Sequence, residues 1–152
     1  MPHKHTIAVA IPTFNAEKTI IRAITSVRNA KPSGPPIPIF IYDNCSTDKT
    51  LSLVSDLHDT SIVIQKSANN YGFNNNIKRC LTETPSEYIA LLCADDTYCD
   101  SHIMNFYKTL ETKGPFDLYH SNYSLVFQDG SIKDTTRKTG IKYPLSILYY
   151  SA

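Results

Sequence analysis

The sequence predicts an α/β fold, in which a mostly parallel sheet is flanked by helices and followed by a late β-hairpin. Short apolar, β-branched runs alternate along the chain with segments whose apolar residues recur at helical spacing. This alternation is typical of parallel sheets with right-handed crossovers. The hairpin is indicated by Asp129-Gly130, a turn pair that lies between residues 117–127 and 131–133.

Length and composition agree with this prediction. The 152 residues correspond to one domain, and 41% hydrophobic with 19% charged residues is typical of a globular chain. The net charge of +1 gives no field for nucleic acid, so we expect no nucleic-acid partner. No apolar run approaches the roughly 18 residues of a membrane span, and the N-terminus lacks the apolar region of a signal peptide. The four cysteines lack paired spacing, and we expect free thiols in the cytoplasm.

The first half of the chain contains two predicted strands, residues 6–11 and 37–42, and each precedes a helix. Asn15 is a suitable cap for a first helix near residues 16–28. The apolar face of that helix consists of Ile20, Ala23, Ile24 and Val27. Ser46 or Thr47 is the expected cap of a second helix, which carries Leu51, Val54 and Leu57.

The second half contains a third and a fourth predicted strand, residues 62–66 and 88–93. The helix between them is expected to have Phe73, Ile77 and Leu81 on one face. A last helix, residues 101–113, ends at Gly114 and carries Ile103, Phe106, Tyr107 and Leu110 on one face. No element is assigned to the tail from Thr135.

Polar residues gather where the predicted strands end. In parallel α/β sheets, ligands bind outside the carboxyl ends of the strands. The segments at these ends are residues 12–15, 43–47, 67–76 and 94–97. Their convergence predicts a binding site at one edge of the sheet.

Asp95 and Asp96 directly follow the apolar fourth strand. Two adjacent carboxylates repel each other beside a low-dielectric strand end, and a divalent cation removes that cost. We expect Mg²⁺ or Mn²⁺, because such ions are held by one or two carboxylates together with substrate phosphates. The alternative is that the pair only begins a turn or caps the next helix. A zinc site with Cys93 and Cys99 is less favoured, because structural zinc usually has paired ligands.

Two further loops offer polar ligands. Asp43 ends the second strand, where a carboxylate can accept hydrogen bonds from a base or a ribose hydroxyl. Its alternative role is capping of the following helix, for which Ser46 and Thr47 are also available. Five asparagines surround Gly72, where a turn is the simpler interpretation, although an amide facing the cleft would explain Asn76.

With these segments in place, the chain resembles the family 2 glycosyltransferases with a GT-A fold. The resemblance is carried, in order, by AIPTFNAEKTI (residues 10–20), IYDNCSTDKT (41–50), NNYGFNNNIKRCL (69–81), EYIALLCADD (87–96) and DLYHSNYSLVFQDGSI (117–132). Each motif alone is weak, but their order and spacing agree over about residues 5–133. The resemblance implies that residues 1–152 form a single GT-A domain that binds a nucleotide sugar.

The resemblance also implies roles for individual residues. The residues expected around the nucleotide sugar are Pro12, Thr13, Asn15, Glu17, Asp43, Asn70, Gly72, Asn76 and Asp95. Asp95 and Asp96 are the expected ligands of Mg²⁺ or Mn²⁺, which would neutralise the leaving diphosphate.

This chain departs from the family pattern at several positions. Asn44 and Cys45 stand where Asp and Gly are usual, Cys93 stands where many members have the first Asp of Asp-Ala-Asp, and Ile77 stands where some carry Arg. Inverting members use a carboxylate base to deprotonate the acceptor. We expect that base beyond Ala152, so that the chain is truncated before the acceptor-side segment and its catalytic residue stays unassigned.

The expected function is therefore transfer of a sugar from a nucleotide-sugar donor, UDP-linked by expectation, to a glycan or lipid-linked acceptor. The transfer would be inverting, metal-assisted and part of cell-surface polysaccharide synthesis. Family resemblance also allows a peripheral association with the inner face of the membrane. The alternatives are a non-catalytic fragment that binds nucleotide sugar and, less favoured, a sugar-1-phosphate nucleotidyltransferase, whose Gly-rich, Arg-containing opening is absent after the first strand.

Overall fold

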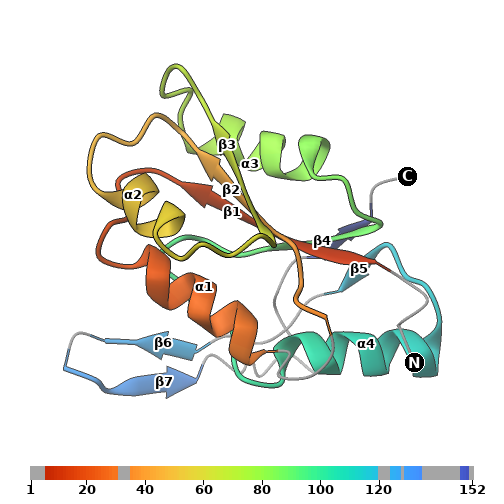
Figure 1. The fold of residues 1–152 in the computed structure, drawn as a ribbon. Helices are drawn as coiled ribbons and strands as arrows, with labels where there is room; N and C mark the ends of the chain where they lie inside the picture. Colours follow the sequence, from red (N-terminus) through yellow and green to blue (C-terminus); the bar gives the residue numbers. More distant parts are fainter. Residues whose placement is uncertain (1–5, 31–34, 120–123, 128, 135–147, 151–152) are drawn as a thin grey trace.

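A mixed sheet forms the centre of the molecule (Figure 1). The computed structural model describes residues 6–30, 35–119, 124–127, 129–134 and 148–150. Along the sheet the strands follow the order β3-β2-β1-β4-β8-β5. The parallel strands are β1 (Ile7–Thr13), β2 (Ile39–Asp43), β3 (Ile62–Lys66) and β4 (Tyr88–Leu91). On the far side of β4, β8 (Leu148–Tyr150) pairs antiparallel with both β4 and β5 (Leu118–Tyr119).

Helices cover both faces of this sheet. α3 (Phe73–Glu83) lies on one face, and α1 (Ile20–Asn29), α2 (Thr50–Ser55) and α4 (His102–Lys113) lie on the other (Figure 1). Within the described part of the chain, every helix is too short or too polar to cross a membrane. The expected α/β fold with a mostly parallel sheet is confirmed.

The alternation of side chains along β1 explains the two layers. Ile7, Val9 and Ile11 belong to the larger core, together with residues of α1, α2 and α4. Ala8 and Ala10 point to the smaller core under α3, where they meet Phe40, Tyr42 and Cys80. All of β1 is buried, as expected for a central strand of a parallel sheet.

The predicted face of the last helix is confirmed in α4. Ile103, Phe106, Tyr107 and Leu110 are buried there. The Phe106 ring makes an edge contact with Tyr88 of β4, at 5.2 Å between ring centroids. The helix ends at Gly114, whose φ of 79° is the left-handed conformation that glycine adopts without strain.

Three expectations about helix ends and faces were wrong. α1 begins at Ile20, and the Asn15 side chain caps nothing there, because its oxygen bonds to the loop after β2. α2 begins at Thr50, where Asp48 accepts the first backbone N–H in place of Ser46 or Thr47, and Leu57 lies beyond the helix, exposed. In α3 the buried residues are Asn76 and Cys80, whereas Phe73 is 63% exposed.

The late hairpin is confirmed, but it is shorter than expected. β6 (Ser124–Val126) pairs antiparallel with β7 (Ile132–Asp134), and Gly130 in the turn has a φ of 80°. Residues 118–119 were expected in this hairpin, yet they form β5 in the main sheet, whose partner β8 lies in the tail that the sequence left unassigned. The four cysteines are free thiols, as expected.

Candidate functional site

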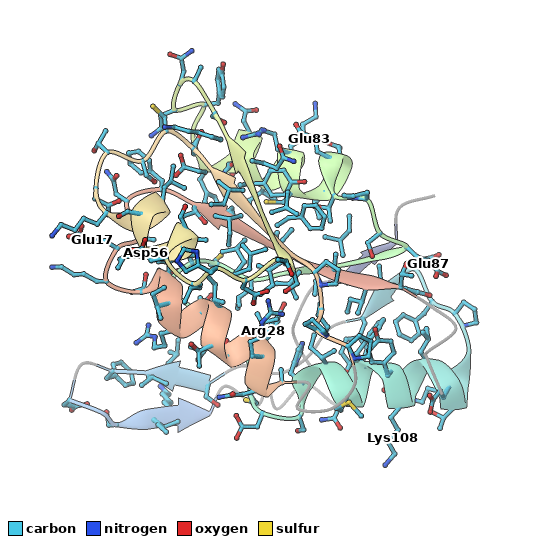
Figure 2. The ribbon with its side chains drawn as sticks, in the orientation of Figure 1. Glu17, Arg28, Asp56, Glu83, Glu87 and Lys108 are labelled. Atoms are coloured by element: carbon cyan, nitrogen blue, oxygen red, sulfur yellow. The ribbon has the colours of Figure 1, made fainter. Side chains whose placement is uncertain are left out.

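A cleft of about 920 Å³ opens at the carboxyl ends of β1, β2 and β4. Figure 2 shows Glu17 at this end of the sheet and Glu87 at the opposite end. All of the predicted site residues except Asp43 line the cleft, namely Pro12, Thr13, Asn15, Glu17, Asn70, Gly72, Asn76, Asp95 and Asp96. Asn44 and Asp48 from the loop after β2 also line the cleft, so the strand order brings together residues from the loops after β1, β2, β3 and β4.

Asp43 itself is fully buried behind the cleft wall. Both of its carboxylate oxygens accept the backbone N–H of Ser46, at 3.2 and 3.3 Å. The carboxylate therefore supports the turn after β2, whereas the first backbone N–H of α2 is bound by Asp48. A direct contact between Asp43 and a ligand stays a prediction.

Asn15 joins the loop after β1 to the loop after β2. Its backbone N–H donates to Ser46 Oγ, and its side-chain oxygen accepts the backbone N–H of Thr47, each at 2.9 Å. Asn15 has a φ of 47°, a left-handed conformation that asparagine tolerates better than most residues. The backbone N–H and the side-chain oxygen of Asn15 are thus both used to hold the two loops of the cleft wall together.

Glu17 and Asp48 strengthen the same junction. Glu17 Oε2 accepts the backbone N–H of Lys49, and the Glu17 backbone N–H donates to Asp48 Oδ2, both at 3.0 Å. Desolvation alone would raise the pKa of Asp48, but hydrogen bonds from the side chain and backbone of Thr50 hold that pKa below its ordinary value. Asp48 also lines the cleft. This residue was missed in the sequence, although its position two residues before the second helix could have indicated a role at the helix start.

Asn44 fastens the glycine loop to the end of β2. Its side-chain Nδ2 donates to Asn70 Oδ1 at 2.7 Å and to the carbonyl of Gly72 at 3.4 Å, while its oxygen accepts the backbone N–H of Tyr71 at 2.9 Å. Asn44 is only 3% exposed. Both a donor and an acceptor are needed here, which explains an amide at a position where the resemblance leads one to expect a carboxylate.

Asn76 brings a buried amide to the cleft from α3. Its Nδ2 donates to the carbonyl of Tyr42 at 2.7 Å, which fixes the amide orientation, because an oxygen there would repel the carbonyl. The other amide atom, Oδ1, is buried and has no hydrogen-bond partner among the described residues. The sequence-based expectation that Asn76 lies at the cleft agrees with this placement.

The acidic pair follows β4 in a turn closed by a hydrogen bond from the Asp96 N–H to the Cys93 carbonyl. Ligand atoms of Cys93, Asp95 and Asp96 lie within 4.8 Å of one another. Desolvation and the Asp95 charge raise the pKa of Asp96, against a smaller lowering by Arg22. Burial and the same two carboxylates raise the pKa of the Cys93 thiol. Negative charges on groups this close repel one another, and a bound cation would relieve that repulsion. Carboxylate oxygens and a sulfur are also ligands that divalent cations accept, so the group fits a divalent cation.

Helix α1 holds the acidic turn in place. The Arg22 guanidinium donates to the carbonyl of Asp95 at 2.8 Å. One helical turn later, Ser26 Oγ accepts the backbone N–H of Tyr98 at 3.0 Å. Sequence reasoning missed both residues, because their partners lie more than 70 positions away in the chain.

Two exposed aromatic side chains also line the cleft. Phe14 is 48% exposed and follows β1, and Phe73 is 63% exposed and begins α3. Exposed rings in a cleft are suited to stacking on a flat ligand.

Comparison with known proteins identifies the family of this chain. The model of the family described as Glycosyl transferase family 2 matches residues 8–124. The chain belongs to glycosyl transferase family 2. The expected family and its transferase class are thereby confirmed.

Two bacterial proteins illustrate the sequence similarity of this family 2 chain to its relatives. Protein RfbJ of Shigella flexneri is 31% identical over 98 residues, which are 64% of this chain and 70% of RfbJ. WfaP of Escherichia coli, a UDP-Glc:alpha-D-GlcNAc-diphosphoundecaprenol beta-1,3-glucosyltransferase, is 30% identical over 119 residues, which are 77% of this chain and 45% of WfaP. The chain thus spans less than half the length of WfaP.

Solved structures confirm the GT-A fold. The TarS 1-349 fragment of S. aureus in complex with UDP-GlcNAc has a TM-score of 0.67 at 20% identity, over 76% of this chain and 33% of that fragment. The mannosyltransferase PcManGT of Pyrobaculum calidifontis, in complex with GDP-Man and Mn²⁺, has a TM-score of 0.67 at 14% identity, over 98% of this chain and 45% of that protein.

Cys45 is a departure from the family pattern whose backbone conformation bears on stability. Its φ of 70° is left-handed, and the family pattern has glycine at this position. A left-handed non-glycine residue costs about 1–2 kcal/mol, while glycine loses roughly 0.5–1 kcal/mol in chain entropy. We therefore expect Cys45→Gly to raise the free energy of unfolding by about 0.5–1 kcal/mol in urea titrations. The matched control is Cys99→Gly, where φ is not left-handed, and this change should lower the free energy of unfolding. Equal effects of the two substitutions would show that the left-handed conformation of Cys45 is not strained.

Proposed function

We propose that the cleft binds a nucleotide-sugar donor and that the chain takes part in transfer of its sugar to a glycan or lipid-linked acceptor. The observation that carries the proposal is that predicted residues from the loops after β1, β3 and β4 meet in one cleft of about 920 Å³, together with Asn44 and Asp48 from the loop after β2. Support also comes from family 2 membership and from fold neighbours that hold UDP-GlcNAc or GDP-Man. A UDP-linked sugar is the proposed donor, in keeping with the name of WfaP.

In this proposal the diphosphate lies against the acidic turn. Asp95 and Asp96 would hold a divalent ion there, and the ion would supply Lewis-acid stabilisation of the leaving diphosphate when bound. Arg22 fixes the backbone of Asp95 and so keeps the turn in position for the donor. Thr13 and Asn15 would lie beside the nucleoside, and Asn44 would keep Asn70 and Gly72 in reach of it.

Phe14 is proposed to stack on the nucleobase. Stacking of a base on an aromatic ring contributes roughly 1–3 kcal/mol, so Phe14→Ala should weaken UDP binding by about tenfold or more in calorimetric titrations. Phe14→Tyr should retain the affinity, because a ring is kept. Phe127→Ala is the control, since Phe127 is 49% exposed on the hairpin and does not line the cleft. Equal affinities of the Phe14→Ala and Phe127→Ala variants would refute the stacking.

The base that activates the acceptor is proposed to lie outside the cleft walls described above. Asp117 and Asp129 are exposed and do not line the cleft, and the Asp129 carboxylate accepts hydrogen bonds from Ser131 within the hairpin. Because neither carboxylate lines the cleft, the base of the proposed inverting reaction would come from a residue outside these walls. The diphosphoundecaprenol-linked acceptor in the name of WfaP supports a lipid-linked acceptor, and polysaccharide synthesis is the proposed setting.

Calorimetry with UDP, GDP and the matching nucleotide sugars, with Mn²⁺ or Mg²⁺ present, tests the donor site. Binding of at least one nucleoside diphosphate is expected, and no heat at protein concentrations that detect millimolar affinity would count against the proposal. Release of UDP from the nucleotide sugar would dismiss the alternative of a non-catalytic binding fragment. Release of pyrophosphate from UTP and a sugar phosphate would instead support a nucleotidyltransferase.

A further inference from the structure

The end of the cleft that is proposed to hold the metal contains a sulfur atom as well as carboxylates. Cys93 follows β4 and is half-buried, while Asp95 and Asp96 are exposed beside it. The ligand atoms of these three residues lie within 4.8 Å of one another. Cys99, the other cysteine near the pair, is exposed and lies outside this group.

The distances allow one ion to contact all three side chains. With a metal–sulfur bond of about 2.3 Å and metal–oxygen bonds of about 2.1 Å, a tetrahedral ion holds its ligand atoms about 3.4–3.6 Å apart. The three ligand atoms lie within 4.8 Å of one another, so side-chain movements of about 1 Å bring them to these separations. Such shifts need no movement of the backbone turn, which Arg22 holds through the Asp95 carbonyl.

A second, separate observation indicates that this cleft is built for a ligand. Asn76 is 3% exposed and lines the same cleft, and its Oδ1 has no hydrogen-bond partner among the described residues. A buried acceptor without a partner costs roughly 1–3 kcal/mol, and a donor group on a bound molecule would remove that cost. The fold neighbour with GDP-Man also holds Mn²⁺.

We propose that Cys93 ligates the divalent ion of the donor site together with Asp95 and Asp96, and that its sulfur makes the site select Zn²⁺-like ions over Mg²⁺. A thiolate is a soft ligand that suits Zn²⁺, whereas Mg²⁺ demands oxygen ligands in a near-ideal octahedron. Binding breaks the Cys93 S–H bond, releases the proton to solvent and forms a sulfur–metal bond. The inference rests on the proposed donor site and assigns it a metal class.

Titration of the purified chain with Co²⁺, a coloured substitute for Zn²⁺, tests the sulfur ligand directly. A cobalt–thiolate bond gives an intense charge-transfer absorption in the near ultraviolet, which oxygen ligands do not give. The absorption is expected in the wild type and in the control variant Cys99→Ser, and it should disappear in Cys93→Ser. Its absence from the wild type, or its survival in Cys93→Ser, would overturn the proposal.

Cys93→Asp provides the converse test, because it installs the acid that many family members carry. Competition between Zn²⁺ and Mg²⁺, followed by calorimetry, should show the Zn²⁺ preference falling by at least about tenfold in this variant. Circular dichroism checks that the variants remain folded. An unchanged preference in folded Cys93→Asp would overturn the selectivity.

The outcomes separate this inference from the donor site itself. Tight UDP or GDP binding with Mg²⁺, without any thiolate absorption from Co²⁺, would overturn the role of Cys93 and leave the donor site standing. Thiolate absorption that depends on Cys93, without binding of any nucleoside diphosphate, would support the metal assignment and refute the proposed function.

Discussion

Asp96→Ala is expected to remove metal-dependent nucleotide binding while leaving the fold intact. Asp96 lines the cleft, is exposed, and lies within ligand distance of Asp95 and Cys93. Loss of a carboxylate ligand should weaken binding of UDP in the presence of Mn²⁺ on the order of a hundredfold, which corresponds to about 2.8 kcal/mol. Calorimetric titration with and without the ion measures the loss. The melting temperature should not fall, because the substitution also removes repulsion from Asp95.

Asp100→Ala is the matched control for this prediction. Asp100 is exposed on the same segment but does not line the cleft, so its substitution should leave the affinity for UDP unchanged. If Asp96→Ala bound UDP as tightly as the wild type with the ion present, Asp96 would not be a metal ligand.

Asn44→Asp is expected to destabilise the chain, although aspartate is the usual family residue at this position. The change replaces the Nδ2 donor with an oxygen that faces the Asn70 side-chain oxygen and the Gly72 carbonyl. Asn70 cannot turn its amide without losing the bond that its oxygen accepts from the Gly72 N–H at 2.8 Å. Two lost hydrogen bonds and a buried carboxylate should lower the free energy of unfolding by roughly 2–4 kcal/mol.

Urea titrations of Asn44→Asp and Asn69→Asp make the comparison. Asn69 lies in the same loop but is exposed, so the same chemical change there should cost less than about 0.5 kcal/mol. Asn44→Asp should also weaken nucleotide binding, because the loop with Asn70 and Gly72 loses its attachment to β2. A cost for Asn44→Asp no larger than for Asn69→Asp would show that the donor role of Asn44 is unimportant.

Elements whose sequence pattern matches their surroundings were predictable. The bounds of β3 and the buried face of α4 agree with the sequence, because local spacing and burial coincide there. In α3 they do not coincide. The small residues Ala8 and Ala10 leave room for the helix side that carries Asn76 and Cys80, and the Tyr42 carbonyl accepts a hydrogen bond from Asn76 Nδ2. Periodicity favoured Phe73 instead, and the tertiary context overrode it.

The positions of the site residues were predictable, but their bonding partners were not. Strand ends in a parallel sheet meet at one edge, so the loops with Asn15, Gly72 and Asp96 were expected together. The bonds of Asn15 and Glu17 connect residues more than 30 positions apart, and no spacing rule identifies such partners. For the same reason the partners of Arg22 and Asn44, which position other residues, could not be predicted from the sequence.

The bonds between residues 15–17 and 46–50 also bear on the proposed binding of a ligand. Loop segments that must be ordered on binding reduce affinity, because the free chain loses conformational entropy at that step. Here the backbone N–H groups of Asn15, Glu17, Thr47 and Lys49 are already engaged in hydrogen bonds to side chains of the facing loop. Amides held in this way exchange slowly with solvent deuterons when local opening is rare. This wall of the cleft should therefore be protected from exchange before any nucleotide arrives, and a ligand would meet a surface already in its bound shape.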